Sequence, residues 1–231
     1  WKKIEDTAQP ILNIKVSHGT IEKGPASATL QFNNADIEES PMAQMLEDRF
    51  LRQCLIREIK ENTFIDLIEQ RTVSEIIDLD SKKHLTLDNN SKLQASLLVA
   101  SDGIDSPTAK ASGIRKTGWK YKQRGLVCAV NHEYSSFNTA YQYFLPEGPL
   151  AILPIKNKTA SIVWTESIQN ATTITEMNDE EYLSILQNRF GNFLGKLQLT
   201  GKRLSFPLEL SISKKYVSDK FAVIGDAAHG Y

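Results

Sequence analysis

Cysteine is scarce in this sequence: only Cys54 and Cys128 occur among 231 residues, and their spacing suggests neither a disulfide framework nor a zinc site. Long hydrophobic runs are also missing, because no apolar stretch approaches the roughly 20 residues that cross a bilayer. Neither sign of charge is in excess, since 27 Lys and Arg stand against 28 Asp and Glu, for a formal net charge of -1. That balance argues against a nucleic-acid partner. We therefore expect a protein of a reducing compartment whose contact with membranes is at most peripheral.

The sequence does contain enough apolar residues for a core, with 41% hydrophobic and 24% charged residues. One large domain or two small ones would fit this length. The four histidines show no metal-ligand spacing, and no metal is assigned to His18, His84, His132 and His229. Because Trp1 rather than Met stands first and the chain stops in what looks like the first turn of a helix, we interpret it as an internal fragment.

The first half of the chain alternates short strand patterns with one long helix pattern. Residues 11–16 and 26–32 alternate apolar and polar side chains, which predicts two paired strands. Pro41 is a suitable first residue for a helix over about 42–60, whose wide apolar face predicts burial more than halfway round. Further strands are predicted at 63–70, 72–79, 84–87 and 93–100.

The second half is richer in strand patterns. A short helix is predicted at 107–112, and a helix from Asn178 or Asp179 to Phe190, where Gly191 ends it. The predicted strands are 125–134, 139–145, 150–155, 160–166, 203–212 and 221–224. These elements indicate an α/β fold.

Two of the predicted strands end on an acidic residue beside glycine. Asp102 and Gly103 follow one strand, and Gly225 and Asp226 follow the other. Each strand end places a carboxylate at the carboxyl edge of a sheet, where α/β proteins bind ligands.

The second of these motifs has a specific physical use. Gly225 allows a tight turn, Asp226 can accept a hydrogen bond from a sugar-like hydroxyl, and Ala227 and Ala228 leave room beside a helix amino end that suits a pyrophosphate. An ordinary strand-to-helix turn with Asp226 as N-cap is the alternative.

Both motifs resemble those of one enzyme family. Residues 100–106 (Ala-Ser-Asp-Gly-Ile-Asp-Ser) resemble the Asp-Gly motif of class A FAD-dependent aromatic monooxygenases, and residues 225–229 (Gly-Asp-Ala-Ala-His) resemble their Gly-Asp motif. The resemblance implies that Asp102, with Gly103, lies near the FAD pyrophosphate and the NADPH route. It also implies that Asp226 binds the ribityl chain within the Gly225 to Ala228 turn.

A third motif lies on the long predicted helix. Residues 49–55 (Arg-Phe-Leu-Arg-Gln-Cys-Leu) resemble the family's Arg-x-Leu-x-x-x-Leu helix, whose arginine approaches the flavin. The resemblance implies that role for Arg49. A solvated arginine on a helix surface is the alternative.

The stretch between the two aspartate motifs narrows the resemblance. Residues 144–154, 161–164, 189–191 and 206–208 are similar to the ubiquinone-biosynthesis hydroxylases. The resemblance implies that FAD, NAD(P)H and O2 are used to hydroxylate the ring of a polyprenylated phenol. It implies a cytoplasmic protein, peripheral to the inner membrane, with other ubiquinone-biosynthesis proteins as candidate partners. No single side chain is expected to be the catalyst, since the cofactor carries the hard chemistry.

The resemblance also implies a domain organisation. We expect a partial FAD-binding, glutathione-reductase-like domain at 41–112 and 214–231, and a mostly β, mixed-sheet substrate domain at 113–213, with residues 1–40 joining the substrate sheet.

The chain departs from the family pattern in three places. Ala109 and Lys110 stand where the wider family has an arginine, which leaves the handling of NADPH open. The Gly-x-Gly-x-x-Gly phosphate loop is absent, as is the Pro- and Gly-rich segment that follows the Gly-Asp motif, and we expect both outside this chain.

Two other functions stay open at this point. A flavin hydroxylase of a soluble aromatic compound such as a hydroxybenzoate would use the same two motifs. A non-catalytic binding module that kept the sheet without the phosphate loop would also fit this chain.

Overall fold

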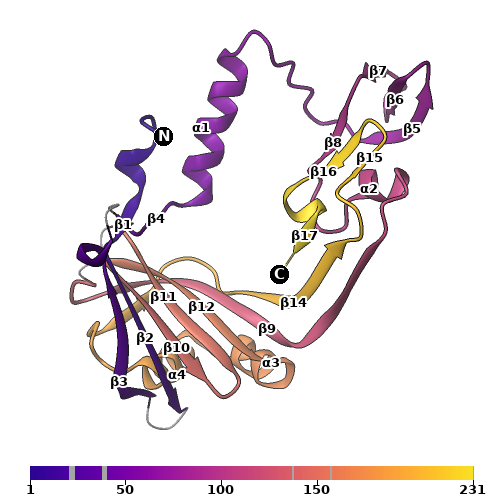
Figure 1. The fold of residues 1–231 in the computed structure, drawn as a ribbon. Coiled ribbons are helices and arrows are strands. Elements are labelled where there is room, and N and C mark those ends of the chain that lie inside the picture. The colour runs from indigo at the N-terminus through magenta and orange to yellow at the C-terminus, as the bar shows by residue number, and fades with distance from the viewer. Residues whose placement is uncertain (21–23, 38–40, 137, 157, 231) are drawn as a thin grey trace. The chain divides into compact units, whose positions relative to one another are not determined.

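A computed structural model describes residues 1–20, 24–37, 41–136, 138–156 and 158–230 (Figure 1). The chain forms two compact units. We call Trp1–Thr63 with Lys122–Pro207 the sheet unit, and Phe64–Tyr121 with Leu208–Tyr231 the motif unit. Strands β9 (Lys116–His132) and β14 (Leu204–Ser213) run from one unit into the other. The predicted α/β fold class is confirmed.

The sheet unit is built on a mixed sheet with the strand order β9-β12-β11-β10-β2-β3, and β13 (Leu197–Leu199) pairs with β9. Neighbouring strands are antiparallel except β10 and β2, which are parallel. The strands are β2 (Asn13–Thr20), β3 (Gly24–Asn33), β10 (Thr139–Leu145), β11 (Gly148–Ile155) and β12 (Thr159–Ser167). The strands predicted in these stretches, and the pairing of the first two, are confirmed.

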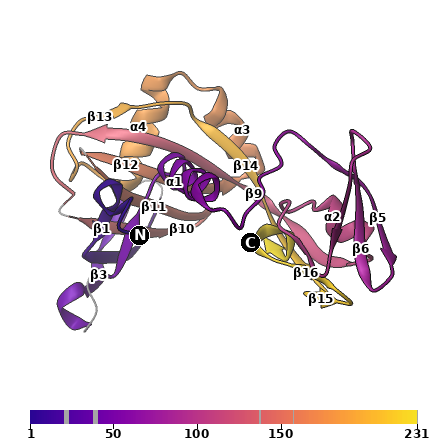
Figure 2. The same cartoon turned by 90° about the horizontal axis from the view of Figure 1, so that it is seen from above.

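One face of this sheet forms the core of the unit. Helices α3 (Ile168–Glu176) and α4 (Asp179–Phe190) cover it (Figure 1, Figure 2), and Trp164, Tyr182 and Phe190 are buried between the layers. Helix α4 begins and ends as predicted, because Asn178 forms a capping box with Glu181 and Gly191 closes the helix. Helix α3 was not predicted, since its threonine-rich sequence has low helix propensity.

The other face of the sheet is more exposed. Val163 is 38% and Phe144 55% exposed. The register aligns Val127, Val163 and Ala151 across β9, β12 and β11, so their side chains lie on the same face. This face therefore presents an apolar surface.

The predicted helix over 42–60 is wrong at its beginning and in its burial. Residues Ala43–Met45 form β4, which pairs with β1 (Gln9–Ile11), and α1 spans Asp48–Glu61. Pairing with β1 satisfies the backbone that a longer helix would have used. No residue of α1 is buried, and Leu55 is 51% exposed. The apolar stripe exists, but the described part of the chain does not bury it.

The sheet unit also contains two short 3-10 helices, η1 (Glu5–Thr7) and η2 (Asn34–Asp36). Among the described residues, no helix is long and apolar enough to span a membrane.

The motif unit contains two small sheets. Strands β5 (Val73–Leu79), β6 (Lys82–Leu87) and β7 (Lys92–Ala95) form an antiparallel sheet. The other sheet joins β15 (Val217–Ser218), β16 (Phe221–Val223) and β8 (Leu98–Ala100). Helix α2 (Pro107–Ala111), η3 (Gly225–Ala227) and β17 (His229–Gly230), which pairs with β14, complete the unit.

Two strand predictions in this unit are corrected. Residues 63–70 form no strand, and their apolar side chains, including Phe64, are exposed. The strand predicted at 93–100 is two strands, β7 and β8, that belong to different sheets, so the chain must turn between them.

Candidate functional site

The two aspartate motifs lie at the same edge of a parallel strand pair. Strands β8 and β16 are parallel, with Leu98 opposite Phe221 and Ala100 opposite Val223, and the Ile224 N–H donates to the Ala100 carbonyl at 3.0 Å. Parallel strands end at the same edge. The turns that carry Asp102 and Asp226 therefore leave the sheet side by side, as expected for a ligand site of an α/β protein.

Asp102 is held by its own turn. Its Oδ1 accepts a hydrogen bond from Ser106 Oγ at 2.5 Å, and its Oδ2 accepts one from the Thr108 N–H at 2.9 Å. Partial burial raises the pKa of Asp102, but the hydrogen bonds from Ser106 and Thr108 together outweigh it and leave the pKa below its ordinary value. Both carboxylate oxygens thus stabilise the start of α2, where Ser106 Oγ accepts from the Ala109 N–H.

Asp226 is exposed, as Asp102 is, but its carboxylate differs from that of Asp102 in its hydrogen bonds. Within the described ranges the Asp226 carboxylate has no hydrogen bond or ion pair. The alternative role of N-cap is not seen, because the N-cap position of η3 belongs to Ile224. Both oxygens of Asp226 are consequently free to accept hydrogen bonds from a ligand.

Glycine is required at both turns. Gly103 has a φ of +87° and Gly225 a φ of +56°, in the left-handed region that side chains rarely adopt. A Cβ built on either residue would meet no heavy atom within 4 Å. The backbone of both turns is therefore open to close approach by a ligand.

The two alanines after Asp226 face inward. Ala227 and Ala228 are buried, and Ala228 packs in the core with Phe221 and Val223. The carbonyl of Ala228 accepts from the Ser213 N–H at 2.8 Å. Their small size thus serves packing against the β14 end.

The helix expected to begin in this motif is not formed within the described residues. The 3-10 turn η3 is followed by β17, in which His229 pairs with Ile212 and Gly230 with Ser211. Pairing with β14 satisfies the backbone groups that a continued helix would have used. Tyr231 lies outside the described residues.

Arg49 lies in the sheet unit, on the first turn of α1. Its Nε is 2.9 Å from Glu47 Oε2, and its guanidinium lies 4.5 Å from the centre of the Phe50 ring. It also lines a cavity of about 440 Å³ whose other lining residues are Glu47, Ala129, Ile155, Lys156, Thr159, Thr200 and Gly201. The Arg49 side chain is 66% exposed, so a solvated arginine on a helix surface stays open, and its approach to a flavin stays a prediction.

A buried ion pair beneath the sheet was not found by sequence reasoning. Arg189 Nη2 is 2.8 Å from Glu166 Oε1, and the two side chains are 6% and 1% exposed. Trp164 Nε1 donates to the same Glu166 oxygen at 2.9 Å, and the Arg189 guanidinium stacks 4.6 Å from the Trp164 ring centre. Burial lowers the pKa of Arg189, and the neighbouring Glu166 and Glu147 oppose this effect. The only sequence signal was that residues 161–164 and 189–191 lie in the stretches that resemble one subfamily.

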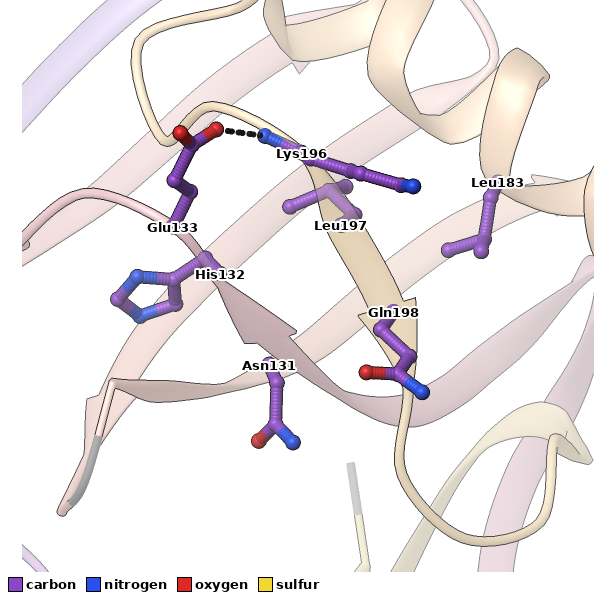
Figure 3. Close-up of a pocket in the computed structure, with 7 residues that line it drawn as sticks. All are labelled: Asn131, His132, Glu133, Leu183, Lys196, Leu197 and Gln198. Atoms are coloured by element: carbon purple, nitrogen blue, oxygen red, sulfur yellow. Dashed lines mark hydrogen bonds between the residues drawn. The ribbon is translucent and has the colours of Figure 1, made fainter.

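A further cavity of the sheet unit contains none of the predicted site residues. It has a volume of about 630 Å³ and is lined by Asn131, His132, Glu133, Leu183, Lys196, Leu197 and Gln198 (Figure 3). His132 Nδ1 donates to the Tyr134 carbonyl at 2.6 Å, and Figure 3 shows its ring turned away from Leu183 and Gln198. We therefore do not assign the site here.

Comparison with protein families gives one match to most of the chain. The model of the "FAD binding domain" family matches residues 43–231. This range includes Arg49 and both aspartate motifs.

Among curated proteins, the chain is 33% identical to ubiquinone hydroxylase UbiL of Rhodospirillum rubrum over 100% of this chain and 52% of the relative. It is 26% identical to 3-demethoxyubiquinol 3-hydroxylase of Escherichia coli over 88% of this chain and 52% of the relative. The chain thus spans about half the length of these relatives.

Among solved structures, p-nitrophenol 4-monooxygenase PnpA of Pseudomonas putida superposes with a TM-score of 0.76 at 11% identity, over 99% of this chain and 58% of that one. At this identity the likeness concerns the fold alone. It agrees with the combination of part of a flavin-binding fold and a mostly β domain that the sequence predicted.

Proposed function

Since the chain belongs to the FAD binding domain family, we propose that the protein that carries it is an FAD-dependent monooxygenase of ubiquinone biosynthesis. Its reaction would use NAD(P)H and O2 to hydroxylate the aromatic ring of a polyprenylated phenol. The observation that carries the proposal is the free carboxylate of Asp226 at the edge of the parallel β8–β16 pair. The 33% identity to a ubiquinone hydroxylase supports the choice of substrate class.

The residues at this edge fit a flavin nucleotide. In the proposal, Asp226 accepts hydrogen bonds from ribityl hydroxyls, while the open backbone at Gly225 and Gly103 allows close approach of the cofactor. Asp102 holds the neighbouring turn in shape, and Ala227 with Ala228 anchors the Gly-Asp turn to the core. When bound, FAD supplies the oxidation of NAD(P)H and the activation of O2.

The exposed face of the sheet unit is the proposed substrate surface. The aligned row of Val127, Val163 and Ala151 carries no charge, and Phe144 adds an exposed ring on the same face. Such a surface can orient an aromatic ring and a prenyl chain and exclude water from the reacting atoms. A hydroxybenzoate would instead call for a cation opposite its carboxylate. Because Arg49 and Lys156 line a cavity with Ala129 and Ile155 of this same face, the choice of the polyprenylated substrate is supported by the 33% identity to a ubiquinone hydroxylase.

The other parts of the proposal follow from the same family relation. We assign residues 41–112 and 214–231 to the flavin-binding domain, and residues 113–213 with 1–40 to the substrate domain. Arg49 would approach the flavin, as the family relation implies. A polyprenylated substrate resides in a bilayer, so we place the protein in the cytoplasm, peripheral to the inner membrane, with other ubiquinone-biosynthesis proteins as partners.

The test uses the purified full-length protein. We expect bound FAD, and NAD(P)H oxidation that a prenylated phenol stimulates and 4-hydroxybenzoate does not, with a ring-hydroxylated product identified by mass spectrometry. Stimulation by 4-hydroxybenzoate alone would favour the soluble-substrate alternative, and absence of bound flavin would favour a non-catalytic module.

A matched pair of variants locates the substrate surface. Val163→Glu places a charge on the proposed surface, and we expect KM for the prenylated phenol to rise at least about tenfold while bound FAD is retained. Ile168→Glu makes the same change at an exposed position on α3, at the opposite side of the sheet, and should leave KM unchanged. An equal rise of KM in the two variants would contradict substrate binding to this face.

A further inference from the structure

Two adjoining cavities of the motif unit gather positive charge. The first, of about 370 Å³, is lined by Asp105, Ser106, Ala109, Lys110, Ile114, Arg115, Lys116 and Lys214. The second, of about 260 Å³, is lined by Gly113, Ile114, Arg115, Lys214 and Lys215. They share Ile114, Arg115 and Lys214, and the Lys214 N–H donates to the Arg115 carbonyl at 2.8 Å, which joins the two basic segments. We call the pair the basic cavity.

The charge of this cavity is not compensated from within. Its lining contains five cationic residues and one acidic residue, Asp105. Among the described residues, the side chains of Lys110, Arg115, Lys214 and Lys215 have no hydrogen bond or ion pair. Elsewhere in the same unit, by contrast, Lys83 pairs with Asp78. Clustered like charges repel one another, and a bound anion removes that repulsion.

The cavity is also tied to the two aspartate motifs. Lys116 Nζ donates to the Ile104 carbonyl and to the Asp226 carbonyl, the second at 3.4 Å. This lysine holds the turns that carry Asp102 and Asp226 next to the cavity wall. An anion in the cavity therefore lies beside the flavin edge proposed above.

The chemistry of the lining favours phosphate over carboxylate. An arginine fork binds two oxygens of one anion, and lysines around it act as point charges on the others. A phosphate group offers three oxygens and up to two negative charges to several cations at once, whereas a carboxylate offers two oxygens and one charge. Gly113 adds a left-handed backbone turn, at a φ of +75°, with open space at its Cβ position.

We infer that the basic cavity is a binding site for a phosphate group, carried either by a soluble nucleotide or by a lipid headgroup. The inference holds whether or not the protein hydroxylates a phenol, because its readout is anion binding and not turnover. Arg115 and Lys214, which line both cavities, are the central ligands.

The test is a calorimetric titration of the full-length, flavin-loaded protein with inorganic pyrophosphate at low ionic strength. We expect binding that weakens at least about tenfold in the double variant Arg115→Gln, Lys214→Gln. The control is the double variant Lys82→Gln, Lys92→Gln, which removes the same charge from exposed positions of the same unit outside the cavity. Retained flavin absorbance shows that each variant is folded.

Competition then identifies the source of the phosphate. Displacement of pyrophosphate by 2′,5′-ADP, with a weaker effect of 5′-AMP, assigns the cavity to a phosphorylated nucleotide. Displacement by phosphatidylglycerol vesicles, but not by phosphatidylcholine vesicles, assigns it to a lipid headgroup. The inference is overturned if the wild-type protein binds no pyrophosphate, if the cavity variant binds it as the wild type does, or if the control loses as much affinity.

Discussion

The two units of this chain differ in how much apolar surface they bury. The sheet unit buries a continuous cluster from five strands and two helices, including Trp164, Tyr182 and Phe190. The motif unit buries a much smaller cluster, formed by Ala100, Ala109, Ile114, Phe221, Val223 and Ala228. Because the motif unit has the smaller buried cluster, local hydrogen bonds such as those accepted by Asp102 contribute more to the shape of its turns. The two aspartates proposed for the cofactor therefore lie in the unit with the smaller buried cluster.

The burial of charged side chains also differs between the two units. The sheet unit encloses the Glu166–Arg189 pair under its helices, whereas the aspartates of the motif unit lie at an exposed edge. Removing one partner of a buried ion pair lowers the free energy of unfolding strongly. Substituting an exposed carboxylate lowers it little, unless that carboxylate binds a ligand. Three substitutions test this contrast.

The largest effect is expected at Arg189. The substitution Arg189→Met keeps much of the side-chain volume but leaves Glu166 buried without its cation, which should cost about 3–5 kcal/mol of the free energy of unfolding. Denaturant unfolding of the full-length protein, followed by the fluorescence of the buried Trp164, measures the loss.

Two further variants make this result interpretable. Arg52→Met breaks an exposed pair with Asp48 and should cost less than about 1 kcal/mol. Adding Glu166→Gln to Arg189→Met should recover part of the loss, because the uncompensated charge is removed. A loss at Arg189 no greater than that at Arg52 would mean that the buried pair does not support the sheet unit.

How well the sequence predicted the structure differs from element to element in both units. In the sheet unit the period-two alternation of β10 to β12 and the capping residues of α4 gave correct elements, because local pattern and burial agree there. In the motif unit the strand predicted at 63–70 is absent, since its apolar residues have no described partner strand. In the sheet unit, the amphipathic pattern of α1 likewise predicted a buried face, which the described structure lacks because pattern alone does not supply a packing partner.

In the candidate site, too, the sequence predicted local motifs but not the contacts between side chains. The two motifs could be read directly, because glycine beside an acid after an apolar strand has a local physical meaning. The difference between Asp102 and Asp226 could not be predicted. It depends on hydrogen bonds from Ser106 and Thr108 to the Asp102 carboxylate, whereas no described residue donates one to the Asp226 carboxylate. The basic cavity joins residues near 110 with residues near 214 and has no local signature.

The second prediction concerns Asp226. In the full-length protein, Asp226→Ala should remove hydrogen bonds between a charged acceptor and the flavin, which are worth roughly 1.5–3 kcal/mol, or about 10- to 100-fold in FAD affinity. Flavin absorbance after gel filtration measures the retention of FAD. Asp219→Ala is the control, because Asp219 is an exposed aspartate of the same unit that pairs only with its neighbour Lys220 in the described structure. Full flavin occupancy in the Asp226 variant would remove this residue from the site.

The smallest effect is expected at Asp102, and it should depend on pH. At neutral pH, Asp102→Ala removes the acceptor for Ser106 Oγ and the Thr108 N–H, and we expect a loss of about 1 kcal/mol, because the group is exposed. The same variant should slow the reduction of FAD by NADPH as the turn loosens.

The pH dependence follows from the direction of the pKa shift. The pKa of Asp102 is lower in the folded chain than the ordinary value of about 3.9, so its stabilisation is present in full above that value. It is lost as the pH falls through the folded-state pKa, because the protonated carboxyl no longer accepts these bonds as an anion. The difference in unfolding free energy between wild type and Asp102→Ala should therefore be constant from pH 7 to about pH 5 and shrink below about pH 4. A difference that grows on acidification would mean that Asp102 is stabilised in its protonated form, contrary to the hydrogen bonds seen here.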